Sequence, residues 1–147
     1  MKNLEIDYKA LHQIPEEGFE EFKTQQYIID RLEHLNCKIY KIHTGVIAFF
    51  NFNKDYTIAF RAELDGLNIL EETNKEYQSI HQGYMHACGH DGHMSILLGL
   101  CDYLSENTSN VNVCCIFQPS EEKYGGALQM IKDPLFQTFK IKEIYVK

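Results

Sequence analysis

The sequence predicts an α/β fold with a mixed, largely parallel sheet covered by helices. Short runs rich in β-branched and aromatic residues alternate with helical patterns in the second half of the chain, as expected for parallel strands joined by helices. An amphipathic stripe precedes the first of these runs. The chain has 147 residues, enough for one domain with a substantial core.

The first half is expected to contain one helix and three strands. The helix falls within residues 17–35, where apolar side chains recur at spacings of three or seven: Phe19, Phe22, Ile29, Leu32 and Leu35. The strands fall at residues 37–43, 45–52 and 56–64, and a turn near Thr44 and Gly45 joins the first two.

The second half alternates regularly between helix and strand. A helix is expected from about residue 92 to residue 106, followed by a strand at 111–117. A short helix at 125–133 and a last strand at 142–147 complete the pattern. Cys114 and Cys115 lie inside the apolar run of the first of these strands, so we expect them to be small core residues.

Composition and charge exclude several classes of function. The net charge of −7 argues against nucleic acid or an anionic membrane as the main partner. No apolar run approaches the roughly 20 residues needed to span a bilayer, and the start MKNLEIDYKA has no signal-peptide core. The five cysteines form an odd set, which favours reduced thiols and a cytoplasmic location over a disulfide framework.

Polar residues follow two of the expected strands and precede the helix between them. In open α/β sheets, ligands bind outside the carboxyl ends of the strands. Asp65 follows the strand at 56–64, and Glu121 and Glu122 follow the strand at 111–117. The stretch MHACGHDGH, residues 85–93, lies just ahead of the intervening helix. We therefore expect these groups to converge at one edge of the sheet.

Cys88 and His90 form a C-x-H pair on a glycine-flanked loop, where both side chains can face one ion. A thiolate and an imidazole are favoured donors for zinc and its transition-metal neighbours. An isolated C-x-H motif is more often a buried thiol beside surface histidines. Here the surrounding histidines and the nearby acidic residues Glu121 and Glu122 favour a metal site instead. His86 and His93 either cap or solvate the start of the helix or take a direct part.

The carboxylates can divide the remaining work. One of Glu121 and Glu122 can bind a metal ion while the other takes a proton from an activated water. Asp65 is placed to orient a metal-bound histidine through its free ring nitrogen. Arg61 and Glu63 share a strand face with Asp65, and a solvent-facing strip explains those two residues equally well.

Several stretches together resemble the M20 metallopeptidase family, specifically its amidohydrolase branch. That branch includes N-acyl-amino-acid and hippurate hydrolases and N-acetyldiaminopimelate deacetylases. The matching stretches occur in the family's order: LHQIPEEGFEEFKT, TGVIAFF, FRAELDGLNILEET, MHACGHDGH and IFQPSEE. Asn68 departs from the pattern where relatives commonly have proline, and Glu63 where they commonly have aspartate. The fold implied is the first part of a di-metal aminopeptidase-like catalytic domain.

The resemblance implies a metal-dependent enzyme that hydrolyses the amide bond of a small N-acyl amino acid. It implies two divalent ions, of zinc, manganese, cobalt or nickel, with Cys88, His90 and Glu122 as ligands. Glu121 is implied as the catalytic general base, and Asp65 as the catalytic carboxylate behind the metal site. A small-molecule substrate is implied, with no role for nucleic acid or a membrane.

The family also has features that follow the last stretch matched here. A further histidine ligand follows the strand at 142–147, another lies far downstream, and a dimerisation or lid domain is inserted between the two catalytic halves. Residues 1–147 are therefore expected to form the N-terminal part of the catalytic domain, with little or no activity alone, in a full-length protein that is a homodimer.

Two other interpretations stay open. The chain could be a non-catalytic, truncated metal-binding remnant. It could also be a cysteine-dependent hydrolase with Cys88 as the nucleophile, although the glutamate pair would then have no role.

Overall fold

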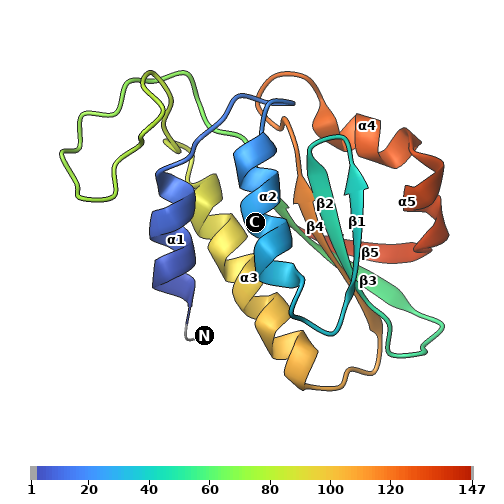
Figure 1. Cartoon of the computed structure of the whole chain (residues 1–147). Helices are drawn as coiled ribbons and strands as arrows, with labels where there is room; N and C mark the ends of the chain where they lie inside the picture. The colour runs from blue at the N-terminus through green and yellow to red at the C-terminus, as the bar shows by residue number, and fades with distance from the viewer. Residues whose placement is uncertain (1–2, 147) are drawn as a thin grey trace.

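The computed structural model describes residues 3–146 as one sheet with helices on both faces (Figure 1). The elements, in chain order, are α1 (Leu4–His12), α2 (Phe22–Leu32), β1 (Lys38–Ile42), β2 (Gly45–Phe50), β3 (Thr57–Glu63), α3 (His90–Glu106), β4 (Asn112–Gln118), α4 (Gly126–Lys132), α5 (Pro134–Thr138) and β5 (Ile141–Tyr145). The predicted α/β class is confirmed. The last residue of the strand expected at 142–147, Lys147, lies outside the described residues.

The sheet is mixed, with strand order β1-β2-β4-β3-β5. β1 pairs with β2, and β2 with β4, in antiparallel fashion, and the hairpin between β1 and β2 turns at His43 and Thr44 as predicted. β3 lies between β4 and β5 and is parallel to both. The parallel part of the sheet therefore consists of β4, β3 and β5. It includes β3 and β4, the two strands expected to carry the site.

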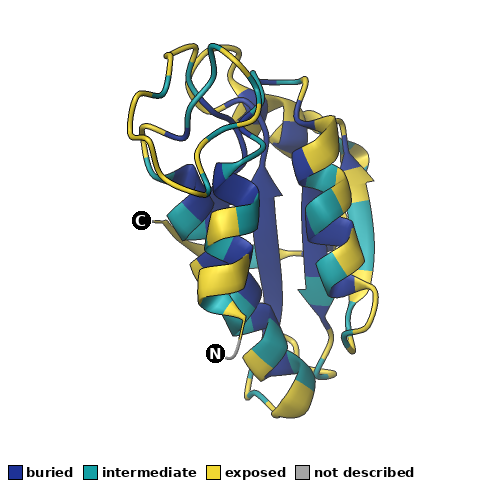
Figure 2. Ribbon diagram, turned by 60° about the vertical axis from the view of Figure 1, so that its left-hand side comes forward, coloured by how far each residue is buried: buried dark blue, intermediate teal, exposed yellow. Residues whose placement is uncertain are grey.

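The inner strands β2 and β4 are buried on both faces because helices cover the sheet on each side, whereas the edge strands β1 and β5 are more exposed. On one face α2 and α3 pack against alternate strand residues such as Phe50, Phe117 and Cys115, and α1 packs against α3. On the other face, Met130 of α4 and Phe139 pack against the strand residues that point to that side, including Cys114. The two cysteines are thus core residues, one on each face, as predicted. Figure 2 shows the buried centre of the sheet between more exposed helices.

The starts of two helices differ from the sequence-based expectation, and a third helix was not expected. α2 begins at Phe22 rather than near Glu17, because the preceding chain is not helical and Phe19 has a φ of 66°. α3 begins at His90, after Gly89 with a φ of 87°, and so includes the first turn that was expected to be loop. α5 was not predicted, although the side chain of Asp133 caps it by accepting from Leu135 N (2.8 Å) directly before Pro134.

α1 was also missed as a separate helix, and it presents only a narrow buried side to α3. Between β3 and α3 the chain forms a long loop that projects beyond the upper end of α1 in Figure 1. Backbone hydrogen bonds between Leu67 and Met85 (2.9 and 3.0 Å) close the neck of this loop. We call residues 67–85 the neck loop.

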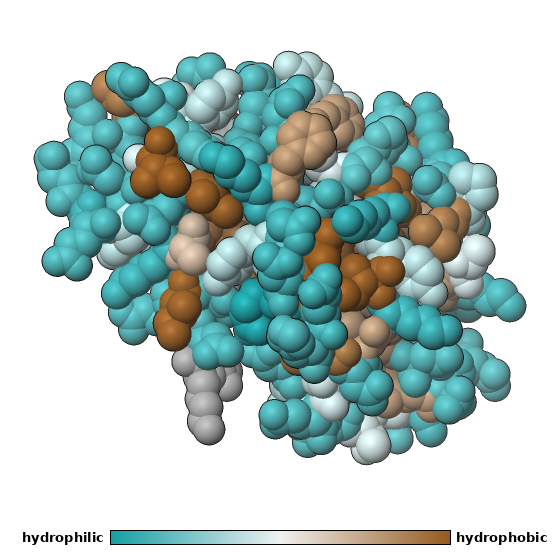
Figure 3. Space-filling model, viewed as in Figure 1, coloured by the Kyte–Doolittle hydropathy of each residue, from teal (hydrophilic) through white to brown (hydrophobic). Residues whose placement is uncertain are grey.

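The outer surface is mostly hydrophilic on the face seen in Figure 3, where hydrophobic side chains gather in separate groups. Within residues 3–146, no helix is both long enough and apolar enough to cross a membrane.

Gly99→Ala is expected to stabilise the fold. Gly99 lies inside α3, and a β-carbon added there would meet no heavy atom within 4 Å. Alanine would lower the conformational entropy of the unfolded chain without a steric cost, so the free energy of unfolding should rise by about 0.5–1 kcal/mol. Urea denaturation measures this change, and an unchanged or lower value would contradict the packing described for α3.

Candidate metal centre

The predicted convergence at the sheet edge follows from the parallel pairing of β3 with β4. Glu63 pairs with Gln118 at the carboxyl end of this ladder, and Leu64 N donates to Gln118 O (2.9 Å) just past it. The residues that follow both strands therefore emerge at the same edge. α3, which connects the two strands, must begin at that edge, and its first residue is His90.

Three candidate ligands lie together at this edge. A ligand atom of Cys88, one of His90 and one of Glu122 all lie within 4.8 Å of one another. His90 is buried, whereas Cys88 and Glu122 are exposed. The imidazole Nε2 of His90 lies 3.9 Å from Oε1 of Glu122. Sulfur, nitrogen and oxygen donors at this spacing suit a divalent transition-metal ion after small side-chain adjustments.

Asp65 fixes the orientation of the His90 ring. Nδ1 of His90 lies 2.8 Å from the backbone carbonyl of Asp65, and 3.4 Å from Oδ1 of its side chain. Because Nδ1 faces a carbonyl oxygen it carries the hydrogen, which leaves the lone pair on Nε2, the nitrogen nearer Glu122. The orienting contact predicted for the Asp65 side chain is thus made most closely by its backbone.

The carboxylate of Asp65 also holds the loop that carries Glu121 and Glu122. Its Oδ2 accepts a hydrogen bond from Glu122 N (2.9 Å). Burial raises the pKa of Asp65, but hydrogen bonds from His90 and from the backbone of Glu122 and Glu121 outweigh it, so the pKa falls below its ordinary value. Asp65 is therefore a buried carboxylate that is ionised and tied to both sides of the site.

The surroundings of Cys88 are acidic. A hydrogen bond with Glu122, with smaller effects of burial and of Glu121 and Glu63, raises the pKa of the Cys88 thiol. A nucleophilic cysteine needs a lowered pKa, which positive neighbours provide. A bound cation would reverse this balance and favour the thiolate. The donor set and its charge therefore suit a metal ligand and not a free nucleophile, which argues against a cysteine-dependent hydrolase.

A second buried carboxylate, Glu21, supports the loop that carries Glu121 and Glu122. Oε1 of Glu21 accepts from Ser120 N (2.8 Å), and Oε2 accepts from the Thr44 hydroxyl. Ser120 itself has a φ of 46° and is fully buried. Glu21 was not predicted, because its partner lies 99 residues away and no local pattern reveals the contact.

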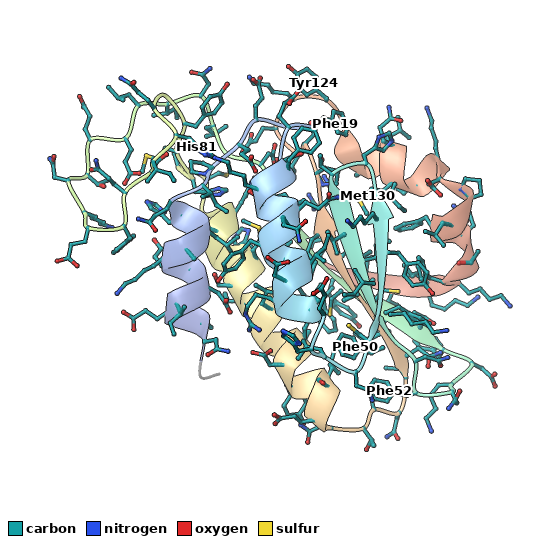
Figure 4. The ribbon with its side chains drawn as sticks, in the orientation of Figure 1. Phe19, Phe50, Phe52, His81, Tyr124 and Met130 are labelled. Carbon is teal, nitrogen blue, oxygen red and sulfur yellow. The ribbon has the colours of Figure 1, made fainter. Side chains whose placement is uncertain are left out.

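Glycines let the chain approach this loop closely. A β-carbon on Gly126 would lie 1.7 Å from Pro119 O, and one on Gly18 would lie 2.3 Å from Ser120 Oγ. Above them, the rings of Phe19 and Tyr124 stack with centroids 6.0 Å apart, as Figure 4 shows at the upper edge of the molecule. The start of the loop after β4, at Pro119 and Ser120, is therefore buried and packed on several sides, whereas residues 121–125 are exposed.

Glu63 is not part of a solvent-facing strip. Its buried carboxylate lies between Nη2 of Arg61 (3.2 Å) and Nδ1 of His93 (2.9 Å). His93 thus pairs with Glu63 and is not one of the three grouped donors. His86 is also outside that group: it is buried, both ring nitrogens lack a hydrogen-bond partner, and burial lowers its pKa to about 4. Among residues 3–146, the grouped donors are those expected from the sequence.

The fold and this edge define the chain as an α/β domain of the metallopeptidase class. It belongs to peptidase family M20/M25/M40, whose model matches residues 59–146, more than half of the chain. A crystal structure from Bacillus subtilis, described as a dinuclear metal-binding peptidase of the M20 family, is 33% identical and superposes with a TM-score of 0.91. That match covers 99% of this chain and 42% of the other.

Two similar relatives are N-acetyldiaminopimelate deacetylases. The enzyme of Oceanobacillus iheyensis is 46% identical over 144 residues, which are 95% of this chain and 39% of the relative. The enzyme of Shouchella clausii is 44% identical over 140 residues, which are 93% of this chain and 37% of the relative. The chain thus spans about two fifths of the length of these relatives.

Glu21→Gln should alter how stability depends on pH. Burial raises the pKa of Glu21, against opposing hydrogen bonds from Thr44 and Ser120. The folded state therefore holds this proton more tightly than the unfolded state does, and the wild type loses stability as pH rises from the ordinary value through the raised one. Glutamine does not titrate, so the variant lacks this loss. As pH rises through the window, the free energy of unfolding of the variant should therefore increase relative to that of the wild type.

Urea denaturation of both proteins at intervals between about pH 4 and pH 7 measures this difference. A difference that stays constant across the window would show that Glu21 is not the titrating group.

Proposed function

We propose that this chain provides metal ligands and the general base of a metal-dependent amidohydrolase that acts on N-acyl amino acids. One observation carries the proposal: the donor atoms of Cys88, His90 and Glu122 meet at the carboxyl edge of a peptidase-family sheet. The names of the relatives support an N-acetylated amino acid such as N-acetyldiaminopimelate as the substrate.

Cys88, His90 and Glu122 would hold divalent metal, and the name of the Bacillus subtilis structure supports two ions in the whole site. Zinc, manganese, cobalt and nickel all suit this mixed donor set. When bound, such ions polarise an amide carbonyl and lower the pKa of a water molecule to about 7. Asp65 contributes by keeping the hydrogen of His90 on Nδ1, so that Nε2 is free to coordinate.

Glu121 is the proton carrier in this proposal. It is exposed and follows Ser120, whose backbone N–H is held by Glu21, and its negative charge contributes to the raised pKa of the Cys88 thiol. We assign to it removal of a proton from the attacking water and delivery of that proton to the leaving amine nitrogen. The neighbouring Glu122 is held differently, through its backbone hydrogen bond to Asp65, which favours a fixed role as ligand.

The whole enzyme is proposed to be a cytoplasmic homodimer in which residues 1–147 form the N-terminal part of the catalytic domain. The three grouped donors of residues 3–146 do not fill the coordination of two ions. Further ligands would come from the part of the fold that the relatives carry beyond the matched region.

Cobalt binding tests the metal centre directly. The reduced 147-residue chain titrated with Co²⁺ should develop a near-ultraviolet band from thiolate-to-cobalt charge transfer, because Cys88 is the only cysteine of the grouped donors. Cys88→Ser should remove the band. Cys37→Ser, at a half-buried cysteine outside the site, is the matched control and should keep it. Absence of the band in the wild type would refute the proposed ligand set.

Glu121→Gln tests the general base in a chimera of residues 1–147 with the remaining part of the Oceanobacillus iheyensis relative. Loss of the base should lower kcat for N-acetyldiaminopimelate by a factor of roughly 10²–10⁴ while metal content stays near normal. Glutamine keeps the size of the side chain, so a change in folding is not expected. Retained turnover would contradict the assignment of Glu121.

The same assay on the isolated 147-residue chain is expected to give little or no hydrolysis. Strong turnover by the isolated chain would show that the remaining ligands are not needed.

A further inference from the structure

A buried histidine lies between two carboxylates outside the proposed ligands. His12, at the end of α1, is 4% exposed. Its Nδ1 lies 2.5 Å from Oδ2 of Asp91, and its Nε2 lies 3.1 Å from Oε1 of Glu71. The three residues come from α1, from the first turn of α3 and from the neck loop. The proposed reaction uses none of them.

Asp91 connects this cluster to the helix that carries His90. It directly follows His90, is 1% exposed, and its Oδ1 accepts from Gly92 N (2.9 Å). Ser95 also donates to the backbone carbonyl of Asp91 (2.6 Å). The Asp91 carboxylate is therefore built into the first turn of α3, and His12 is its side-chain partner.

Glu71 connects the cluster to the neck loop. Its Oε2 accepts from Ser79 N (2.7 Å), and its Oε1 accepts from the Thr73 hydroxyl. These bonds tie residues 71–79 into a closed subloop. Burial raises the pKa of Glu71, but the bonds from Ser79, Thr73 and His12 outweigh it, so the pKa lies below its ordinary value. The side chain is thus an ionised acceptor at the base of the loop.

Cys88 lies on the short segment between the end of the neck loop and the start of α3. Residue 85 ends the neck loop in its backbone bridge to Leu67, and α3 begins at His90, so Cys88 is placed by what holds the loop and the helix together. Among the hydrogen bonds of residues 3–146, none joins the neck loop directly to α3, whereas the side chain of His12 contacts both, Glu71 in the loop and Asp91 in the helix. Figure 4 shows another residue that holds the loop, His81, lying beside the N-terminal segment, where its Nδ1 donates to Pro15 O (2.9 Å).

We propose that His12 is a positioning residue for the metal centre: it bridges the neck loop and the first turn of α3 and so sets the position of Cys88 relative to His90. This inference rests on the proposed function. The imidazolium form of His12 can donate to Asp91 and Glu71 at once. A neutral amide side chain can replace one of these contacts but not both: the nitrogen of asparagine can take the place of Nδ1, and that of glutamine the place of Nε2.

Cobalt titration of the reduced 147-residue chain tests the role of His12. His12→Asn and His12→Gln should each weaken Co²⁺ binding by about tenfold or more, as is typical when a group behind a metal ligand is lost, and should lower the thiolate-to-cobalt band relative to the d–d bands. His34→Asn, the same change at an exposed histidine, should leave both unchanged. Far-ultraviolet circular dichroism checks that each variant is folded.

A double-mutant cycle separates positioning from general destabilisation. If Glu71 acts through His12, Glu71→Ala should weaken Co²⁺ binding in the wild type and have little further effect in His12→Asn. Glu71→Ala also provides the test if the His12 variants do not fold. Wild-type affinity in folded His12→Asn, or in Glu71→Ala, would overturn the inference while leaving the proposed ligands intact. No Co²⁺ binding by the wild type would overturn the proposed function, and this inference with it.

Discussion

The parallel pairing of β3 with β4 is the constraint on which the candidate site depends. Two neighbouring parallel strands end at the same edge of a sheet, and the helix that connects them must begin there. This brings together the ends of three segments that lie far apart in the sequence: Asp65, the Cys88–His90 turn, and Glu121 with Glu122. Side-chain hydrogen bonds then refine an arrangement that the backbone topology already requires.

Buried carboxylates supply most of that refinement. Asp65, Glu21 and Asp91 are each at most 2% exposed, and each accepts hydrogen bonds from groups at this edge. A buried carboxylate left without partners would cost several kcal/mol, so each one favours a backbone arrangement that supplies its hydrogen bonds. Other carboxylates, those of Glu122, Glu121 and Glu63, concentrate negative charge around Cys88, which raises the pKa of its thiol and makes a cation the natural complement of the site.

Local patterns predicted the strands, the helix between them and the grouped donors, because strand period, turn residues and the C-x-H spacing are visible over a few residues. They could not predict the parts fixed by distant contacts. Glu21 meets Ser120 across 99 residues, and His12 meets Asp91 across 79. α1 was missed because few of its side chains are buried, and α2 was extended too far because Phe19 continues the apolar spacing while its φ of 66° does not allow a helix.

The candidate ligands are not held equally firmly, and this difference bears on how such a site works. The His90 ring is buried and fixed through Nδ1 by Asp65, and the backbone of Glu122 is fixed by the same residue. Cys88 is exposed, precedes Gly89 in a left-handed conformation, and has no comparable backbone anchor of its own. Its position therefore depends on the two structures that flank it, the neck loop and the first turn of α3. A donor placed by its neighbours can move toward an ion more easily than one held by its own bonds. The geometry of the whole group then depends on residues such as His12 that would never touch the metal.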